Sequence, residues 1–189
     1  ARAILLPATV QAAVVINEIA WMGTAANANA EWIELSNTDS TQIDLTNWHL
    51  VAANGSPSIT LAGTIAANGY FLLERTSDAS VPSATADQIY TGALTNSGTT
   101  LTLTDAGGAS IDAVAGGANW SSIGGDNASK ETAQRVASGW ETAAATPRVI
   151  NAGVSVPAPS SSSSVTASSP PTTTESSASG SPEYLPLPT

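Results

Sequence analysis

The stretch TLTLTDAGGASID, residues 100–112, indicates the fold class of this chain. Leu101 and Leu103 alternate with threonines, and a side-chain period of two is typical of a β-strand with one buried face and one wetter face. The glycine pair that follows reaches positive φ at little cost, so we expect a tight hairpin into a second strand that begins at Ser110. The stretch therefore predicts antiparallel β-structure.

Short apolar or alternating runs, separated by Gly, Asn, Asp and Ser clusters, continue on both sides of this hairpin. Helix-forming residues are too sparse to supply crossover connections, so the pattern favours antiparallel pairing in an immunoglobulin-like β-sandwich or a barrel. Residues 130–136 fit either one helical turn or a further strand. Eight strands are predicted, at residues 14–20, 31–36, 48–53, 58–61, 70–75, 88–90, 100–105 and 110–114.

Aromatic side chains on or beside these strands are the expected core. Each can bury on the order of 150 to 250 Å² and so contribute strongly to folding. We expect Trp140 to pack back onto the sandwich and the glycine-rich stretch 116–125 to be a flexible surface loop. The aromatic residues assigned to the core are Trp21, Trp32, Trp48, Tyr70 and Phe71.

The composition divides the chain into three parts. Residues 1–12 contain a short apolar run after Arg2, which resembles the back half of a signal peptide, although an N-terminal arm is an alternative. Residues 13–153 are the predicted sandwich. Ser, Thr and Pro make up 24 of the 36 residues from 154 to 189, which predicts a disordered linker because such a segment buries too little apolar surface. We expect further domains beyond that linker.

The charge balance excludes several kinds of partner. Five Lys and Arg stand against fifteen Asp and Glu, for a formal net charge of −10. Nucleic-acid binding draws its affinity from cations placed on phosphates, and anionic lipid headgroups are repelled by an acidic surface, so neither partner is expected. No stretch is long and apolar enough to span a bilayer. The absence of cysteine excludes disulfides and thiolate metal sites.

Short motifs along the chain occur in the order seen in a known family. The sequence resembles the bacterial lamin-tail domain family, which implies an immunoglobulin-like sandwich on an exported or cell-surface protein. One departure is Arg148, where family members often have Gly after Thr-Pro. The resemblance covers about residues 14–151 through VINEIAW (15–21), EWIEL (31–35), IDL (43–45), NW (47–48), GYFLLER (69–75), DQIY (87–90), LTL (101–103), Ile111-Asp112, Glu131, Arg135, GW (139–140), TP (146–147) and Asn151.

No recognisable catalytic machinery accompanies these motifs. His49 is the only histidine and follows Trp48 on a predicted strand, so we expect it to face outward. Glu18, Glu31 and Glu34 lie on two strands that could be adjacent, and paired carboxylates can serve as the acid and base of a glycosidase. The alternative, which we favour, is that they are structural, hydrogen-bonded or paired with an arginine such as Arg75 or Arg135.

No catalytic, cofactor-binding or metal site is predicted, and Ca²⁺ is the one ion worth considering. A calcium site takes about six to eight oxygen ligands, and Asp105 with Asp112, or Asp126 with Asn127, could contribute some of them. No EF-hand loop is present. Three triplets match the N-glycosylation pattern, beginning at Asn54, Asn119 and Asn127, and a bacterial source would make them incidental.

The sequence thus predicts a non-catalytic binding, adhesion or structural module of a secreted or cell-surface bacterial protein. Its expected partner is an unidentified protein or glycan. Because the family is also found attached to extracellular nucleases and other hydrolases, the alternative is an accessory domain of a larger secreted hydrolase. Fold analogy alone does not decide between these functions.

Overall fold

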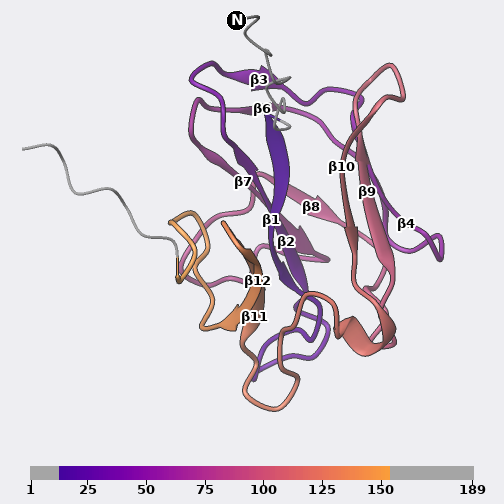
Figure 1. Cartoon of the computed structure of the whole chain (residues 1–189), viewed down its shortest axis with the longest axis vertical. Helices are drawn as coiled ribbons and strands as arrows, with labels where there is room; N and C mark the ends of the chain where they lie inside the picture. The colour runs from indigo at the N-terminus through magenta and orange to yellow at the C-terminus, as the bar shows by residue number, and fades with distance from the viewer. Residues whose placement is uncertain (1–12, 154–189) are drawn as a thin grey trace, which may run out of the picture. The chain divides into compact units, whose positions relative to one another are not determined.

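Two mainly antiparallel sheets and a small ribbon form an immunoglobulin-like β-sandwich in residues 13–153, which are the residues that the computed structural model describes (Figure 1). The six-stranded sheet has the order β12-β11-β1-β2-β7-β8, and the four-stranded sheet has the order β10-β9-β4-β5. Strands β3 and β6 pair separately. The elements are β1 (Val14–Ala20), β2 (Trp32–Asn37), β3 (Ile43–Asp44), β4 (His49–Ala52), β5 (Ser58–Thr60), β6 (Thr64–Ile65), β7 (Tyr70–Arg75), β8 (Gln88–Tyr90), β9 (Thr100–Thr104), β10 (Ser110–Ala115), the 3₁₀ turn η1 (Ala118–Trp120), β11 (Thr132–Val136) and β12 (Gly139–Ala143).

The eight predicted strands are all present, with ends that move by at most one residue. Residues 130–136 contain strand β11, which excludes the helical alternative. Strands β3, β6 and β12 were missed, because two-residue strands show no alternation and β12 is mostly polar. The expectation of purely antiparallel pairing was wrong at one edge, where β8 runs parallel to β7.

The hairpin of residues 100–112 forms as predicted. Leu101 and Leu103 are fully buried, and β9 pairs with β10 in antiparallel register. Gly108 has φ +83°, and an Asp105 carboxylate oxygen accepts hydrogen bonds from the Gly107 and Ala109 amides. The turn is therefore held by the side chain that opens it, as Asx turns are.

The core lies between the two sheets and contains Trp120, which was not among the predicted core residues. Trp120 has no exposed surface, stacks on Trp21 with ring centroids 6.1 Å apart, and donates from its indole nitrogen to the Thr95 carbonyl. The expectation of a flexible loop at residues 116–125 was therefore wrong. A Cβ on Gly116 would lie 2.4 Å from the Trp120 ring, so glycine is there to admit the indole.

Most of the aromatic core prediction is confirmed. Trp21, Trp32 and Phe71 are buried, whereas Trp48 and Tyr70 are only partly buried. Trp48 still packs against the core. Tyr70 does not, because it pairs in register with Ser36 and so lies on the side of the six-stranded sheet that carries Glu34.

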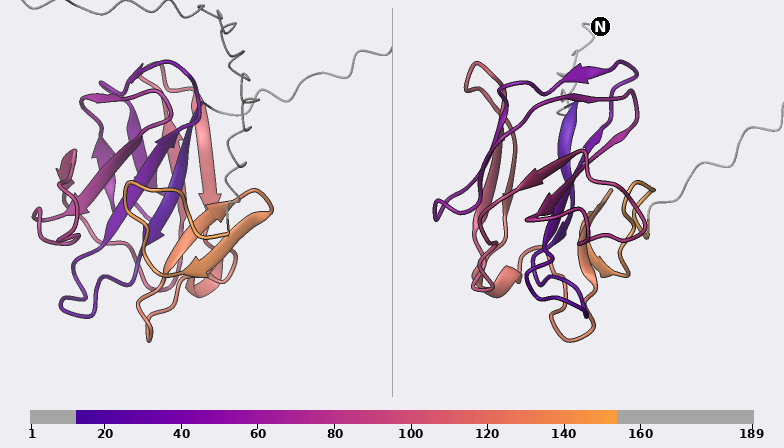
Figure 2. Two further views of the ribbon diagram at one scale, coloured as in Figure 1. Left: turned by 90° about the vertical axis from the view of Figure 1, so that its left-hand side faces the viewer. Right: turned by 180° about the vertical axis from the view of Figure 1, so that it is seen from behind.

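The closing segment, residues 144–153, follows β12. It lies against the face of the six-stranded sheet that is turned away from the four-stranded sheet (Figures 1 and 2). Both faces of the central strands are thereby covered, and β1 and β2 are buried along almost their whole length. The predicted signal-peptide remnant and linker lie outside the described residues. Within residues 13–153, no helix is long and apolar enough to cross a membrane.

Candidate functional site

Two buried glutamates face each other at the centre of the six-stranded sheet. Glu18 of β1 and Glu34 of β2 are partners in register, and neither has exposed surface. Glu18 accepts hydrogen bonds from the Thr132 hydroxyl, from the Gln134 amide at 3.1 Å, and from both the backbone N–H and the hydroxyl of Thr146, at 3.0 and 2.9 Å. The carboxylate is therefore surrounded by donors of β11 and the closing segment.

Glu34 is held by a second set of donors. Its two oxygens accept from the Asn17 side-chain amide at 3.0 Å and from the Arg148 backbone N–H at 2.6 Å. Asn17 sits at a bulge of β1, between Ile16 and Glu18, where the register shifts. Because a bulge re-aims a side chain, the amide reaches Glu34 instead of continuing the alternation.

Asn151 ties the end of the closing segment to the same cluster. Its side-chain amide donates to the Asn17 carbonyl at 3.0 Å and to the Arg135 carbonyl at 2.8 Å. Arg148 has φ +62°, a conformation that glycine adopts without strain. Its guanidinium pairs with Asp87 at 2.7 Å. The position at which the sequence departs from the pattern it resembles is thus one whose backbone conformation favours glycine.

Burial dominates the electrostatics of the pair. Desolvation raises the pKa of Glu34 to about 7, against the opposing hydrogen bonds from Arg148 and Asn17, and the nearby Glu18 charge raises it further. Desolvation also raises the pKa of Glu18. No salt bridge within residues 13–153 includes either carboxylate. The pair is held by neutral hydrogen-bond donors, and the nearby Arg148 charge opposes part of the rise in the pKa of Glu34.

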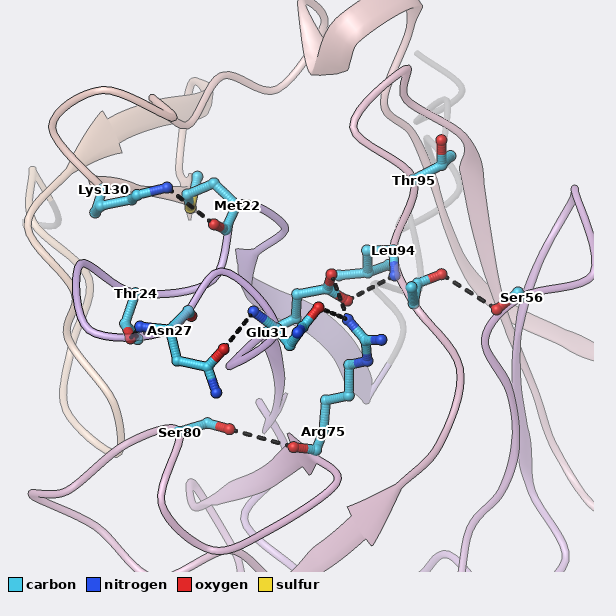
Figure 3. Close-up of polar contacts among 12 residues, drawn as sticks. Met22, Thr24, Asn27, Glu31, Ser56, Arg75, Ser80, Leu94, Thr95 and Lys130 are labelled. Carbon is cyan, nitrogen blue, oxygen red and sulfur yellow. Dashed lines mark hydrogen bonds and ion pairs between the residues drawn. The ribbon is translucent and has the colours of Figure 1, made fainter.

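Glu31, the third candidate carboxylate, anchors a different loop (Figure 3). One oxygen pairs with the Arg75 guanidinium at 2.9 Å, and the other accepts the Leu94 backbone N–H at 2.7 Å. Burial raises the pKa of Glu31, while Leu94 and Arg75 oppose the shift. Glu31 lies one residue before β2, away from the register position that Glu18 and Glu34 share.

These contacts decide between the two hypotheses for the carboxylates. A glycosidase pair must face a substrate, whereas Glu18 and Glu34 are buried and face the protein's own donors. The structural alternative is the one the geometry supports. Arg75 pairs with Glu31, as the sequence suggested for one of the three, and Arg135 pairs with Asp112 instead, at 2.6 Å.

The candidate calcium ligands are engaged in other hydrogen bonds and ion pairs. Asp105 caps the β9–β10 turn, and Asp112 accepts from Arg135 and from the Ile16 backbone N–H. Asp126 accepts the Ala128 N–H. The side-chain oxygen of Asn127 accepts a hydrogen bond from the Lys130 ammonium group. Across residues 13–153 no group of three or more His, Cys, Asp or Glu side chains could hold a metal ion.

The remaining candidate residues, one histidine and three asparagines, lie at the surface. His49 is exposed, as predicted, 3.3 Å from the Thr60 hydroxyl. Asn54, Asn119 and Asn127 are all exposed, but the middle triplet contains the fully buried Trp120.

Two open concavities at the surface are lined in part by polar side chains. The first, of about 270 Å³, lies beside Arg75 between the loops that follow β1 and β7. The second, of about 580 Å³, lies beside Trp140 where β1, β10 and the β11–β12 hairpin meet, with the Arg135 guanidinium 5.0 Å from the Trp140 ring centroid. We call them the Arg75 pocket and the Trp140 groove. Neither the Arg75 pocket nor the Trp140 groove could be predicted from the sequence, because each is formed by segments that only the fold brings together.

The family-model comparison matches residues 7–118 to the lamin tail domain. The chain belongs to the lamin tail domain family. These domains are immunoglobulin-like, in agreement with the sandwich described above, and their fold is consistent with a non-catalytic module. A search among curated proteins found no match. The match ends before β11, β12 and the closing segment, which supply the donors to Glu18 and the backbone donor to Glu34.

Proposed function

We propose that this lamin tail domain is a non-catalytic binding module of an exported or cell-surface protein. One observation carries the proposal: the buried carboxylates are satisfied by the chain's own donors, whereas the polar side chains of the Arg75 pocket and the Trp140 groove line open space. Open concavities with a few convergent polar groups are the usual form of ligand sites.

The acidic charge supports a neutral glycan or a protein as the ligand, since a net charge of −10 repels nucleic acid and anionic lipid. Binding of this kind suits adhesion. It also suits an accessory domain that holds a secreted hydrolase on its substrate, so the proposal does not depend on which larger protein carries the domain.

The test uses the purified full chain on an array of defined glycans and immobilised extracellular proteins, together with turnover assays on chromogenic glycosides and on DNA. Saturable binding without turnover supports the proposal. Turnover that disappears in Glu18→Gln or Glu34→Gln, in a variant that keeps the wild-type circular dichroism spectrum, would overturn it.

A further inference from the structure

The Arg75 pocket is walled by two loops that approach each other at one end of the sandwich. One loop follows β1 and the other follows β7, and Figure 3 shows Asn27, Arg75 and Ser80 around the space between them. Six of the eight lining residues are polar, and none carries an aromatic ring. The polar side chains are those of Asn27, Asn29, Arg75, Thr76, Ser77 and Ser80.

The loop after β7 is held in one shape. Glu74 has no exposed surface, and one of its oxygens accepts the backbone N–H groups of Ser80 and Val81 at 2.8 and 3.1 Å. Thr76 has φ +72°, and the Ser77 N–H donates to the Arg75 carbonyl at 2.9 Å, which closes a γ-turn around Thr76. Positive φ is strained for a β-branched residue, and such strain persists where surrounding contacts impose it, often at ligand sites.

The wall also contains a hydrogen-bond donor that has no acceptor. One guanidinium nitrogen of Arg75 pairs with Glu31, but its buried Nε has no partner within residues 13–153. The side-chain oxygen of Asn27 accepts the Asn29 N–H, and the side-chain NH₂ of Asn27 has no partner in the described part of the chain. Asn27 is exposed, so this NH₂ group is the free donor that a ligand in the pocket can reach, whereas the buried Arg75 Nε is not accessible.

The charge of the pocket restricts the acceptor. Glu31 lies 2.9 Å from the guanidinium and cancels its charge, so the pocket offers donors without a positive field. The net charge of −10 then disfavours an anion. A neutral ligand whose groups both donate and accept matches the amides and hydroxyls of the lining, and sugar hydroxyls do both.

The size of the pocket points the same way. A volume of about 270 Å³ is slightly below the usual range for ligand pockets, which suits a single sugar ring and not a folded partner. Ala30 and Ala79 complete the lining with small side chains that leave the space open. We propose that the Arg75 pocket binds the terminal sugar unit of a neutral glycan, a proposal that rests on the binding function above.

The test pairs a blocked pocket with a matched control. Ala79 and Ala106 are both exposed alanines, one in the Arg75 pocket and one in the β9–β10 turn outside both concavities, so Ala79→Trp and Ala106→Trp make the same change inside and outside the pocket. The full chain is titrated with glucose, galactose, mannose, N-acetylglucosamine and glucuronic acid, with amide NMR shifts as the readout, and then applied to the glycan array.

A neutral sugar should shift the amide signals of Asn29, Thr76 and Ser77, and glucuronic acid should do so at least tenfold more weakly. Ala79→Trp should weaken this binding tenfold or more, while Ala106→Trp leaves it unchanged. Thr76→Gly removes the strain together with a hydroxyl, so it should keep or raise the melting temperature and still weaken binding.

Glycan binding that persists in Ala79→Trp would overturn this inference and leave the proposed binding function standing. The absence of binding to every glycan and protein by the wild-type chain would overturn both. Shifts caused equally by all five sugars and unaffected by Ala79→Trp would show nonspecific contact and would also refute the pocket assignment.

Discussion

The buried Glu34 should make this protein less stable at pH 8 than at pH 5. Its pKa is about 7 in the folded state against an ordinary value of 4.5, a difference worth about 3 kcal/mol. Below pH 4.5 the carboxyl is protonated in both states. Between pH 4.5 and 7 only the unfolded chain loses the proton, so the free energy of unfolding falls as the pH rises. Above pH 7 both states are ionised and the decline ends.

Glutamine at this position removes the titration while keeping the shape. The free energy of unfolding of the wild type and of Glu34→Gln is measured by urea denaturation with tryptophan fluorescence at pH 5 and pH 8. The decline between these values should be about 3 kcal/mol smaller in the variant. Glu141→Gln is the control, because Glu141 is an exposed glutamate of β12, and it should leave the decline unchanged.

Two results would refute this reasoning. One is a wild-type free energy of unfolding that is flat or rises from pH 5 to pH 8. The raised pKa of Glu18 acts in the same direction as that of Glu34 and cannot hide the effect. The other is a Glu34→Gln variant that keeps the full wild-type decline, which would assign the pH dependence to other groups.

Two further substitutions test the polar cluster and the core. Glu18→Gln puts an amide donor among the four donors that face this carboxylate, so it should lower the free energy of unfolding at pH 8 by about 1 to 3 kcal/mol. The melting temperature measures this loss, and an unchanged melting temperature would contradict the structural role of Glu18. Gly116→Ala brings a methyl group into the Trp120 ring and should cost about 1 to 3 kcal/mol in urea denaturation, whereas Gly107→Ala, whose nearest neighbour is 3.3 Å away, should change stability by at most about 0.5 kcal/mol. Equal effects of the two alanines would contradict the packing described for the indole.

The strands could be predicted because each is set by local alternation. Leu101 and Leu103 alternate with threonines in β9, and β7 is a short continuous apolar run, and both patterns can be recognised without reference to the rest of the chain. The candidate carboxylates could be identified for a related reason, since a glutamate within an apolar strand is unusual. Their partners could not, because Thr146 lies 128 residues from Glu18 in the sequence.

Other features were out of reach because they depend on packing between distant segments. The bulge at Asn17 is visible only when β1 is paired with β2. Trp120 stood in a glycine-rich stretch, and glycines usually indicate a loop. Here the composition has a different cause, since Gly116 lacks a side chain because the indole occupies that space. The core position of the tryptophan determines the glycine.

The donors that satisfy the buried Glu18 lie after residues 7–118, the segment that matches the family model, so part of what stabilises the sandwich lies outside that segment. Strand β11 pairs with β1, with Glu18 opposite Gln134, and all four donors to Glu18 lie beyond residue 118. A chain shortened to end at residue 118 would expose the edge of β1 and leave two glutamates on an open sheet face.

We therefore expect the chain ending at 118 to lose the cooperative urea transition followed by circular dichroism, and the chain ending at 153 to keep the midpoint of the full-length protein. In the chain ending at 118, Glu18→Gln should then change the circular dichroism signal little, because the donors that would clash with the new amide are gone. A chain ending at 118 that unfolds with the full-length midpoint would show that the closing segment only covers a sandwich that is already complete. Loss of the transition in that chain alone would show that residues 119–153, which carry both the core residue Trp120 and the donors to the buried carboxylates, are part of the fold.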